Sequence, residues 1–473
     1  MRAALAVAGA LVVAFFAVHA LRAIRFPFPL DYAEGPLLEQ ARLVAAGQNI
    51  YRPLATDYPF TVANYPPVFP ALLALVCKAF GFGYGVARVL TAVAAAACAF
   101  FVGRIAWTTT GDRLAGWVAA AAFLASPYTV FWSSLVRIDF LALAFSLSAI
   151  LLVASRPDAR ATPAWAALLV ALAVLTRQSH LLAGPLAITG ALFARGRRPA
   201  ALFVLVLAAL VGTAVLALDA ATRGGFLFHT VRANENRFSW PLLAYFLSDL
   251  PVASPVLLGL SAWLALARVR ARAPAGVLLA LYLAGATLSA LTIGKVGSHV
   301  NYLLEMTAAL AVFAGLAVAW ARPRASVLVP ALVLVQLAWL LGRTVLRPEN
   351  MEAKLGMRGE FAELQAVLAK EPGPVLADET MGVLVLAAHP ILLQPFEFTQ
   401  LVREGVWDET NVLRDVRDHR FALILVNDGP ATPASWTRER WTVAMLAAVH
   451  EAYEPSGVLA EATLYRPRRG PAP

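Results

Sequence analysis

The stretch LAVAGALVVAFFAVHALRA (5–23), followed closely by DYAEG (31–35), decides the fold class of this chain. A hydrocarbon layer of about 30 Å is crossed by a helix of about 20 apolar residues. The sequence therefore predicts a first membrane helix over 5–23, retained as a signal anchor, with Asp31 and Glu34 just beyond its far end. Carboxylates beside the lipid headgroups can meet an amphiphilic substrate, so they are candidates for a catalytic base.

The composition of the whole chain indicates a polytopic membrane protein. Hydrophobic residues make up 60% of the 473 positions and charged residues only 14%, which excludes one soluble core with a polar coat. The formal net charge is +10, but the basic residues gather at the ends of apolar runs, so we expect no nucleic acid partner. The two cysteines, Cys77 and Cys98, stand in apolar surroundings and predict neither a disulfide framework nor a zinc site.

The apolar runs predict a mainly α fold with about eleven membrane helices. We expect them at 5–23, 84–106, 114–126, 139–154, 163–175, 180–194, 199–219, 251–267, 275–292, 302–320 and 325–342. Basic clusters fall at every second connection: Arg104 with Arg113, Arg156 with Arg160, Arg195 with Arg197 and Arg198, Arg268 with Arg270 and Arg272, and Arg322 with Arg324. The positive-inside rule makes these connections cytoplasmic. The segments 26–83, 127–138, 176–179, 220–250 and 293–301 are then predicted on the outer face.

The longest outer segment begins with the acidic pair and continues into a predicted helix over 36–46. Pro36 stands near its first position and Gly47 just after its last, and its apolar stripe suits a helix in the membrane interface plane. Tyr65 and the pair Pro66-Pro67 follow. Tyrosines at this depth are either headgroup anchors or substrate contacts, and the sequence leaves both open for Tyr65.

These features together resemble the first outer loop of the C-type (GT-C) glycosyltransferase superfamily. That superfamily includes protein O-mannosyltransferases and bacterial lipid A aminoarabinose and lipopolysaccharide sugar transferases. Further similar stretches are Arg137-Ile138-Asp139, Leu175-Thr176-Arg177-Gln178 and the polar loop 229–236, so the resemblance covers about residues 1–342. It implies a donor sugar carried on a polyprenyl phosphate. The chain departs from the O-mannosyltransferases in one respect, because two residues separate Asp31 from Glu34, whereas the two carboxylates are adjacent in those enzymes.

The chemistry of such a transfer assigns roles to particular residues. An acceptor hydroxyl loses its proton as it attacks the anomeric carbon, so we expect Asp31 as the general base, assisted by Glu34. The leaving lipid phosphate gains charge in the transition state, and Arg177 and Lys295 are the candidate phosphate ligands. Arg177 has an alternative role as the buried partner of Asp139 or Glu305. Lys295 has one as an ordinary lysine in a glycine-rich turn.

Five further residues are candidates for substrate binding. They are Arg137, Asp139, His229, Asn234 and Tyr65. Alternatively, Arg137 and Asp139 form a simple ion pair at the start of a helix. The loop around His229 is alternatively an ordinary solvated loop. Lone histidines without partners at metal-ligand spacing predict no metal, and no cofactor is expected.

After Gly342 the chain regains charged residues, which predicts a division into a membrane domain, 1–342, and a C-terminal domain, 343–473. We expect short strands at 374–377, 391–393 and 421–426, and helices at 358–370, 408–419 and 436–452, hence a small α/β domain. An odd number of membrane helices places it outside the cell membrane, as a cap over the site or as an acceptor-docking module.

The sequence therefore predicts a multi-pass membrane glycosyltransferase, one that uses a polyprenyl-phosphate-linked sugar donor. The acceptor is a lipid, a glycan or a protein on the extracytoplasmic face. The alternatives are a transporter or flippase for a lipid-linked or amphiphilic solute and, less favoured, a noncatalytic membrane scaffold. Transporters tend to have related halves, whereas here the polar residues gather at one face.

Overall fold

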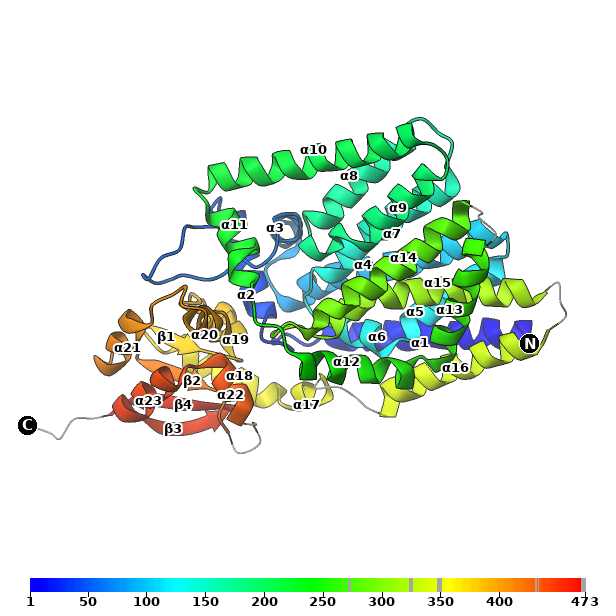
Figure 1. Ribbon diagram of the computed structural model, residues 1–473. Coiled ribbons are helices and arrows are strands. Elements are labelled where there is room, and N and C mark those ends of the chain that lie inside the picture. Colours follow the sequence, from blue (N-terminus) through cyan, green and yellow to red (C-terminus); the bar gives the residue numbers. More distant parts are fainter. Residues whose placement is uncertain (271–273, 323–325, 347–350, 430–431, 433, 469–473) are drawn as a thin grey trace, which may run out of the picture.

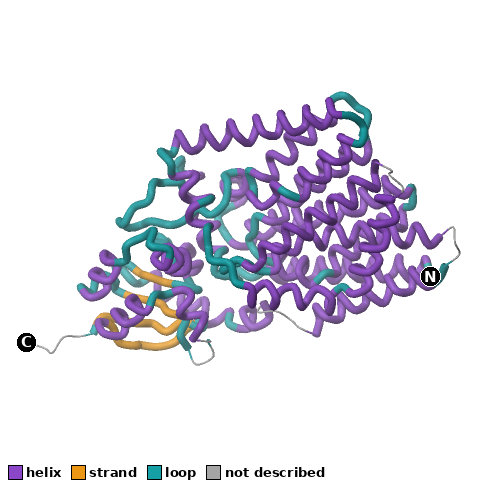
Figure 2. Tube along the Cα trace, in the orientation of Figure 1, coloured by secondary structure: helices purple, strands orange, loops and turns teal. Residues whose placement is uncertain are grey.

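The computed structural model describes residues 1–473 except 271–273, 323–325, 347–350, 430–431, 433 and 469–473. A helical bundle forms the N-terminal part, and a small domain with four strands sits at one end of it (Figures 1 and 2). The N-terminus lies at the opposite end of the bundle from this C-terminal domain (Figure 1). The predicted fold class is confirmed.

The helices of the bundle are long and mostly apolar. They are α1 (Arg2–Ile24), α3 (Val68–Phe80), α4 (Tyr84–Thr110), α5 (Arg113–Ala125), α6 (Pro127–Ser133), α7 (Asp139–Ser155), α8 (Thr162–Val174), α9 (Ala183–Phe193), α10 (Arg197–Ala221), α12 (Trp240–Ala253), α13 (Pro255–Arg270), α14 (Pro274–Ala290), α15 (Leu304–Ala321) and α16 (Leu328–Leu346). Shorter elements near the C-terminal domain are α2 (Glu34–Ala45) and α11 (Gly225–Thr230), with 3-10 turns η1 (Gln178–Leu181), η2 (Arg232–Asn234), η3 (Leu291–Gly294) and η4 (Val300–Leu303).

Each of the eleven apolar runs contains a helix at the expected place, although not every one is a full crossing. Among the described residues, six helices are long and apolar enough to span a membrane, or up to eight if each bent pair is one span. The bent pairs are α5 with α6, at 65°, and α12 with the first part of α13, at 88°. The apolar helix α3 and the full length of α12 were not predicted, because α3 and most of α12 lie in segments that were predicted to be outer loops.

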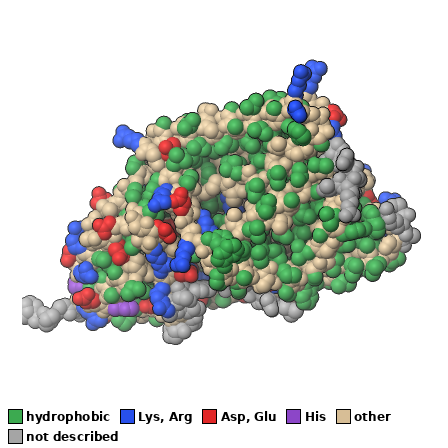
Figure 3. Space-filling model, in the orientation of Figure 1, with side chains coloured by type: hydrophobic (Ala, Val, Ile, Leu, Met, Phe, Trp, Pro, Cys, Tyr) green, Lys and Arg blue, Asp and Glu red, His purple; other side chains and the backbone are tan. Residues whose placement is uncertain are grey.

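The surface of the bundle is apolar where a soluble protein would be polar (Figure 3). Helix α10 shows this most clearly, since only 6% of its most apolar window is buried, and Leu205 and Leu216 are 68% and 73% exposed. Helix α15 is the opposite case, with 89% of its window buried at the centre of the bundle. An apolar belt around an apolar core is the arrangement of an integral membrane protein.

The C-terminal domain contains a four-stranded sheet in the order β1-β2-β4-β3. Its strands are β1 (Val375–Ala377), β2 (Leu423–Val426), β3 (Tyr453–Leu459) and β4 (Ala462–Pro467), and its helices are α17 (Met351–Gly356), α18 (Arg358–Ala369), α19 (Met381–Leu386), α20 (Pro395–Arg403), α21 (Thr410–Arg417), α22 (Ala434–Arg440) and α23 (Val443–Ala452). Strands β1 and β2 are parallel, with Val375 opposite Leu423, and the other pairings are antiparallel.

Two expectations for this domain are corrected. Residues 391–393 form no strand, because they lead without a ladder partner into α20, and the expected helix at 436–452 is divided into α22 and α23. The predicted domain boundary at 342 falls inside α16, which continues to Leu346.

The C-terminal domain docks on α2, which is consequently buried rather than laid against lipid. Residues 34–41 of α2 are all buried. A Cβ added to Gly35 would lie 2.6 Å from the Cα of Gly382 in α19, and the Tyr84 hydroxyl donates to the Gly382 carbonyl at 2.7 Å. Close backbone approach of two glycines thus joins the two parts of the molecule.

The basic clusters, of which Arg272 and Arg324 lie outside the described residues, predict the orientation of the chain in the membrane. We expect a cysteine introduced at the exposed Ala353, in α17, to react with a membrane-impermeant thiol reagent in intact cells. A cysteine at the exposed Ala194, after α9, should react only after permeabilisation. The parent chain is the control, because Cys77 and Cys98 are buried. The opposite labelling pattern would place the cavity described below in the cytoplasm.

Candidate active site

A large cavity lies between the bundle and the C-terminal domain, with a volume of about 1280 Å³. Its lining comes from segments far apart in sequence: the start of α2, the loop before α3, α6, the break before α9, α12, the loop 292–303 and the first turn of α20. Six of the sequence-predicted site residues line it, namely Asp31, Tyr65, Arg137, Arg177, Asn234 and Lys295. Asp139 lines a smaller pocket, which shares Arg177 with the cavity. Glu34 and His229 do not line either space.

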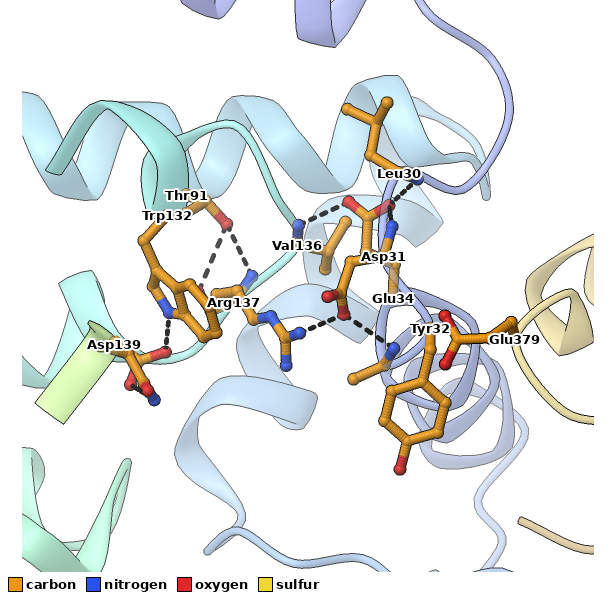
Figure 4. Close-up of polar contacts among 12 residues, drawn as sticks. Leu30, Asp31, Tyr32, Glu34, Thr91, Trp132, Val136, Arg137, Asp139 and Glu379 are labelled. Atoms are coloured by element: carbon orange, nitrogen blue, oxygen red, sulfur yellow. Dashed lines mark hydrogen bonds and ion pairs between the residues drawn. The ribbon is translucent and has the colours of Figure 1, made fainter. Parts of the chain in front are cut away.

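Asp31 lines this cavity, and its side chain is 26% exposed. Its Oδ1 accepts a hydrogen bond from the Ala33 amide at 2.9 Å and forms an ion pair with Arg137 (Figure 4). Arg137 in turn lies over the Trp132 ring, 4.5 Å from its centroid. Among the described residues, both hydrogen bonds to the Asp31 carboxylate reach Oδ1, so Oδ2 is available to a ligand in the cavity.

Glu34, unlike Asp31, lies outside the cavity, in a fully buried and hydrogen-bonded environment. Its side chain is fully buried, as is that of its partner Arg88, which donates to Oε1 at 2.9 Å and to Oε2 at 2.7 Å. The amides of Leu30 and Val136 also donate to Glu34, at 2.6 and 2.7 Å (Figure 4). Arg88 further binds the carbonyls of residues 23, 26 and 28. Glu34 and Arg88 therefore fix the segment that carries Asp31.

Arg177 pairs with Asp139, which is the structural alternative raised by its sequence context. The guanidinium Nη1 lies 2.6 Å from Asp139 Oδ1, and both side chains are buried. Asp139 also accepts from the Trp132 indole at 2.6 Å and from the Asn301 amide at 2.9 Å. Arg177 nevertheless lines the cavity, with its guanidinium 4.5 Å from the centroid of the Tyr302 ring.

Lys295 is a cation of the cavity wall without a carboxylate partner among the described residues. Its ammonium donates to the Asn234 carbonyl at 2.5 Å. Asn234 itself is tied to the backbone, since its amide donates to the carbonyls of Asn64 and His229, both at 3.0 Å. The neighbouring Gly297 adopts φ +82°, a conformation that favours glycine and turns the loop back along the cavity.

His229 has a structural role in this arrangement. Its side chain is completely buried, Nδ1 accepts from the Ala63 amide at 3.0 Å, and Nε2 lies 2.8 Å from the Arg52 carbonyl. Burial lowers its pKa to about 4, so the ring is neutral at physiological pH. Tyr65, by contrast, lines the cavity, and burial raises its pKa to about 12.

The C-terminal domain contributes its own polar groups to the cavity. The Tyr32 hydroxyl donates to Glu397, and burial raises the pKa of the Glu397 carboxyl to about 7. Arg440 lines the same wall and pairs with Glu379. Within the described residues, no group of three or more His, Cys, Asp or Glu side chains is placed to hold a metal ion.

Sequence reasoning missed several residues of this site, among them Arg88, Trp132, Asn301 and Glu397. Arg88 sits inside a predicted membrane helix, and a charge in such a position is itself a signal of a buried partner. Glu397 carried no signal, because it comes from a short helix of another domain.

Comparison with known proteins agrees with this architecture. Residues 64–220 match the family model described as dolichyl-phosphate-mannose-protein mannosyltransferase. No protein of curated function matches the chain significantly in sequence.

Solved structures match over almost the whole chain. ArnT from Cupriavidus metallidurans bound to undecaprenyl phosphate is 15% identical, with a TM-score of 0.66 over 96% of this chain and 97% of that one. The archaeal oligosaccharyltransferase AglB from Archaeoglobus fulgidus, in complex with an inhibitory peptide and a dolichol-phosphate, is 12% identical, with a TM-score of 0.56 over 98% of this chain and 75% of that one. At sequence identities this low, the structural matches are evidence of a shared fold. The chain therefore shares the fold of these two proteins, and residues 64–220 are similar to the mannosyltransferase family.

Proposed function

We propose that this protein transfers a sugar from a polyprenyl phosphate to an acceptor hydroxyl, with Asp31 as the general base. The observation that carries the proposal is the cavity, in which a partly exposed carboxylate faces the same space as a lysine that has no carboxylate partner among the described residues. The solved relatives named above contain undecaprenyl phosphate and dolichol-phosphate, which supports a lipid phosphate as the donor carrier.

Asp31 is suited to act on an acceptor because only one of its oxygens is held. Arg137 and the Ala33 amide orient the carboxylate through Oδ1, so Oδ2 can accept the proton of the attacking hydroxyl. Arg137 fixes the direction of the Asp31 carboxylate, which favours positioning of the base. Glu34 assists indirectly, as the buried anchor of the segment, and does not touch the reacting atoms.

Lys295 is the leading ligand for the donor phosphate. A cation without a carboxylate partner in a partly enclosed cavity gains more from a bound phosphate than one that is already neutralised. Arg177 faces the same cavity, but its guanidinium is oriented by an ion pair with Asp139. A bound phosphate would therefore contact a guanidinium that also binds this carboxylate. Both residues stabilise the charge that the phosphate gains as the glycosidic bond breaks.

Substitutions at these two cations should therefore behave differently. Arg177→Ala should lower the stability of the ligand-free protein by about 3–5 kcal/mol, because it leaves Asp139 buried without its cation. Lys295→Met should leave that stability near the parent value but remove the stabilisation produced by added undecaprenyl phosphate. Thermal denaturation in detergent measures both effects, and Arg197→Ala, on the exposed end of α10, is the control. Full stabilisation of the Lys295 variant by the lipid would remove Lys295 from the phosphate site.

A transporter remains the second candidate, because buried charge pairs in a membrane are also found in transporters. Asp31, Arg137, Arg177 and Lys295 line one cavity between the bundle and the C-terminal domain, which favours chemistry at one membrane face. Reconstituted vesicles distinguish the two, since a transferase forms a new glycosidic product without moving solute across the bilayer.

A further inference from the structure

A second carboxyl group, that of Glu397, lines the cavity from the C-terminal domain and has no part in the proposed mechanism. Glu397 stands in the first turn of α20 and is 9% exposed. Its Oε1 accepts from the Tyr32 hydroxyl, while its Oε2 is buried without a hydrogen-bond partner in the part of the chain that the structure describes. Buried polar atoms are nearly always hydrogen-bonded in proteins, so an unsatisfied oxygen at a cavity wall points to a ligand.

The charges around Glu397 relate it to the general base Asp31. Arg440 and Arg137 are the positive charges that act on Glu397, and Arg137 is also the partner of Asp31. The phosphate candidates have other direct neighbours, since Arg177 lies against Tyr302 and Lys295 against Asn234. An attacking hydroxyl approaches the anomeric carbon from the face opposite to the leaving group when configuration inverts. Glu397 and the base Asp31 thus share a neighbouring cation, Arg137, which relates Glu397 to the acceptor.

The surroundings of Glu397 suit a sugar. The rings of Tyr32 and Phe396 meet edge to face, 6.2 Å between centroids, and both line the cavity. Gln394 lines it as well, held by the Val62 amide, which donates to its Oε1 at 2.5 Å. Aromatic rings cover the C–H face of a pyranose, while a carboxylate and an amide bind its hydroxyls.

We propose that Glu397 and Tyr32 form an acceptor subsite that binds a hydroxyl group of a carbohydrate acceptor, an assignment that rests on the proposed transferase function. The free Oε2 accepts the hydroxyl hydrogen, and Tyr32 holds the carboxylate in place. The C-terminal domain then supplies acceptor recognition, while the membrane domain supplies the base and the phosphate site.

The test uses the purified full-length protein in detergent with methyl glycosides of mannose, glucose and galactose as probes. Saturation-transfer NMR measures their binding, and thermal denaturation measures stabilisation by undecaprenyl phosphate in the same samples. At pH 8, where the Glu397 carboxyl is mainly ionised, we expect Glu397→Gln to weaken binding of the preferred glycoside about tenfold, since a charged acceptor is lost. Tyr32→Phe should weaken it less. Glu363→Gln, an exposed glutamate of α18 in the same domain, should bind as the parent does.

Three outcomes would overturn the subsite. One is unchanged glycoside binding in both Glu397→Gln and Tyr32→Phe, another is the absence of saturable glycoside binding in the parent, and the third is loss of stabilisation by undecaprenyl phosphate in Glu397→Gln. The last result would assign Glu397 to the donor. Failure of the proposed function is seen separately, as a parent protein that undecaprenyl phosphate does not stabilise.

Discussion

Asp31→Asn is expected to reduce sugar transfer at least about a hundredfold, because general base catalysis contributes about that much or more. The amide has nearly the shape of the carboxylate but cannot take the proton of the acceptor. Asp31 is partly exposed at the cavity, so the substituted protein should fold and bind undecaprenyl phosphate as the parent does. Transfer of labelled sugar from a polyprenyl phosphate donor measures the loss, and thermal denaturation measures the folding.

Asp57→Asn is the matched control for this prediction. Asp57 belongs to the same long segment before α3, is exposed, and does not line the cavity. Its substitution should leave transfer unchanged. Retention of more than about a tenth of the activity in Asp31→Asn would contradict general base catalysis by this residue.

Glu34→Gln is expected to destabilise the protein by about 3–5 kcal/mol, the cost of breaking a buried ion pair by removing one partner. The neutral amide leaves Arg88 as a buried cation with only carbonyl partners. Because the same cluster holds the backbone of residues 30–31, transfer should fall together with stability. Thermal denaturation of the purified protein, followed by activity at a temperature where both variants remain folded, measures the two effects.

The control is Glu235→Gln, which breaks an exposed pair with Arg232 and should change stability by less than about 1 kcal/mol. A Glu34→Gln protein as stable as the parent but inactive would show that Glu34 acts on the substrate after all. A protein that loses stability and regains activity on cooling would support the anchoring role derived from the structure.

The pair of Asp31 and Glu34 shows why the sequence could identify a site without assigning its parts. Both carboxylates follow the first membrane helix, and the chain gives no local reason to separate their roles. The roles separate because α4 brings Arg88 against Glu34, while the loop before α7 brings Arg137 against Asp31. Such contacts join residues more than fifty positions apart, and hydrophobic periodicity contains no information about them.

Arg177 and His229 illustrate the same limit. The sequence placed Arg177 at a break between helices and left two partners open, and packing decided for Asp139. His229 belongs to the densest polar loop of the membrane domain. In the structure, however, both nitrogens of its ring are hydrogen-bonded to backbone groups, those of Ala63 and Arg52. Whether a polar side chain faces a cavity or the interior depends on the neighbouring segments, which only the tertiary structure supplies.

The sequence by itself determined the membrane class, the positions of the apolar helices and the C-terminal α/β domain, because burial of apolar side chains in lipid requires runs of fixed length. The order of its polar stretches also indicated the resemblance to the GT-C superfamily. The tertiary structure alone decided which carboxylate faces the cavity, which cations are already paired, and that Glu397 of the C-terminal domain lines the same space as Asp31. The physical reason is that an ionised group gains or loses most from its nearest partner, and those partners are distant in the chain.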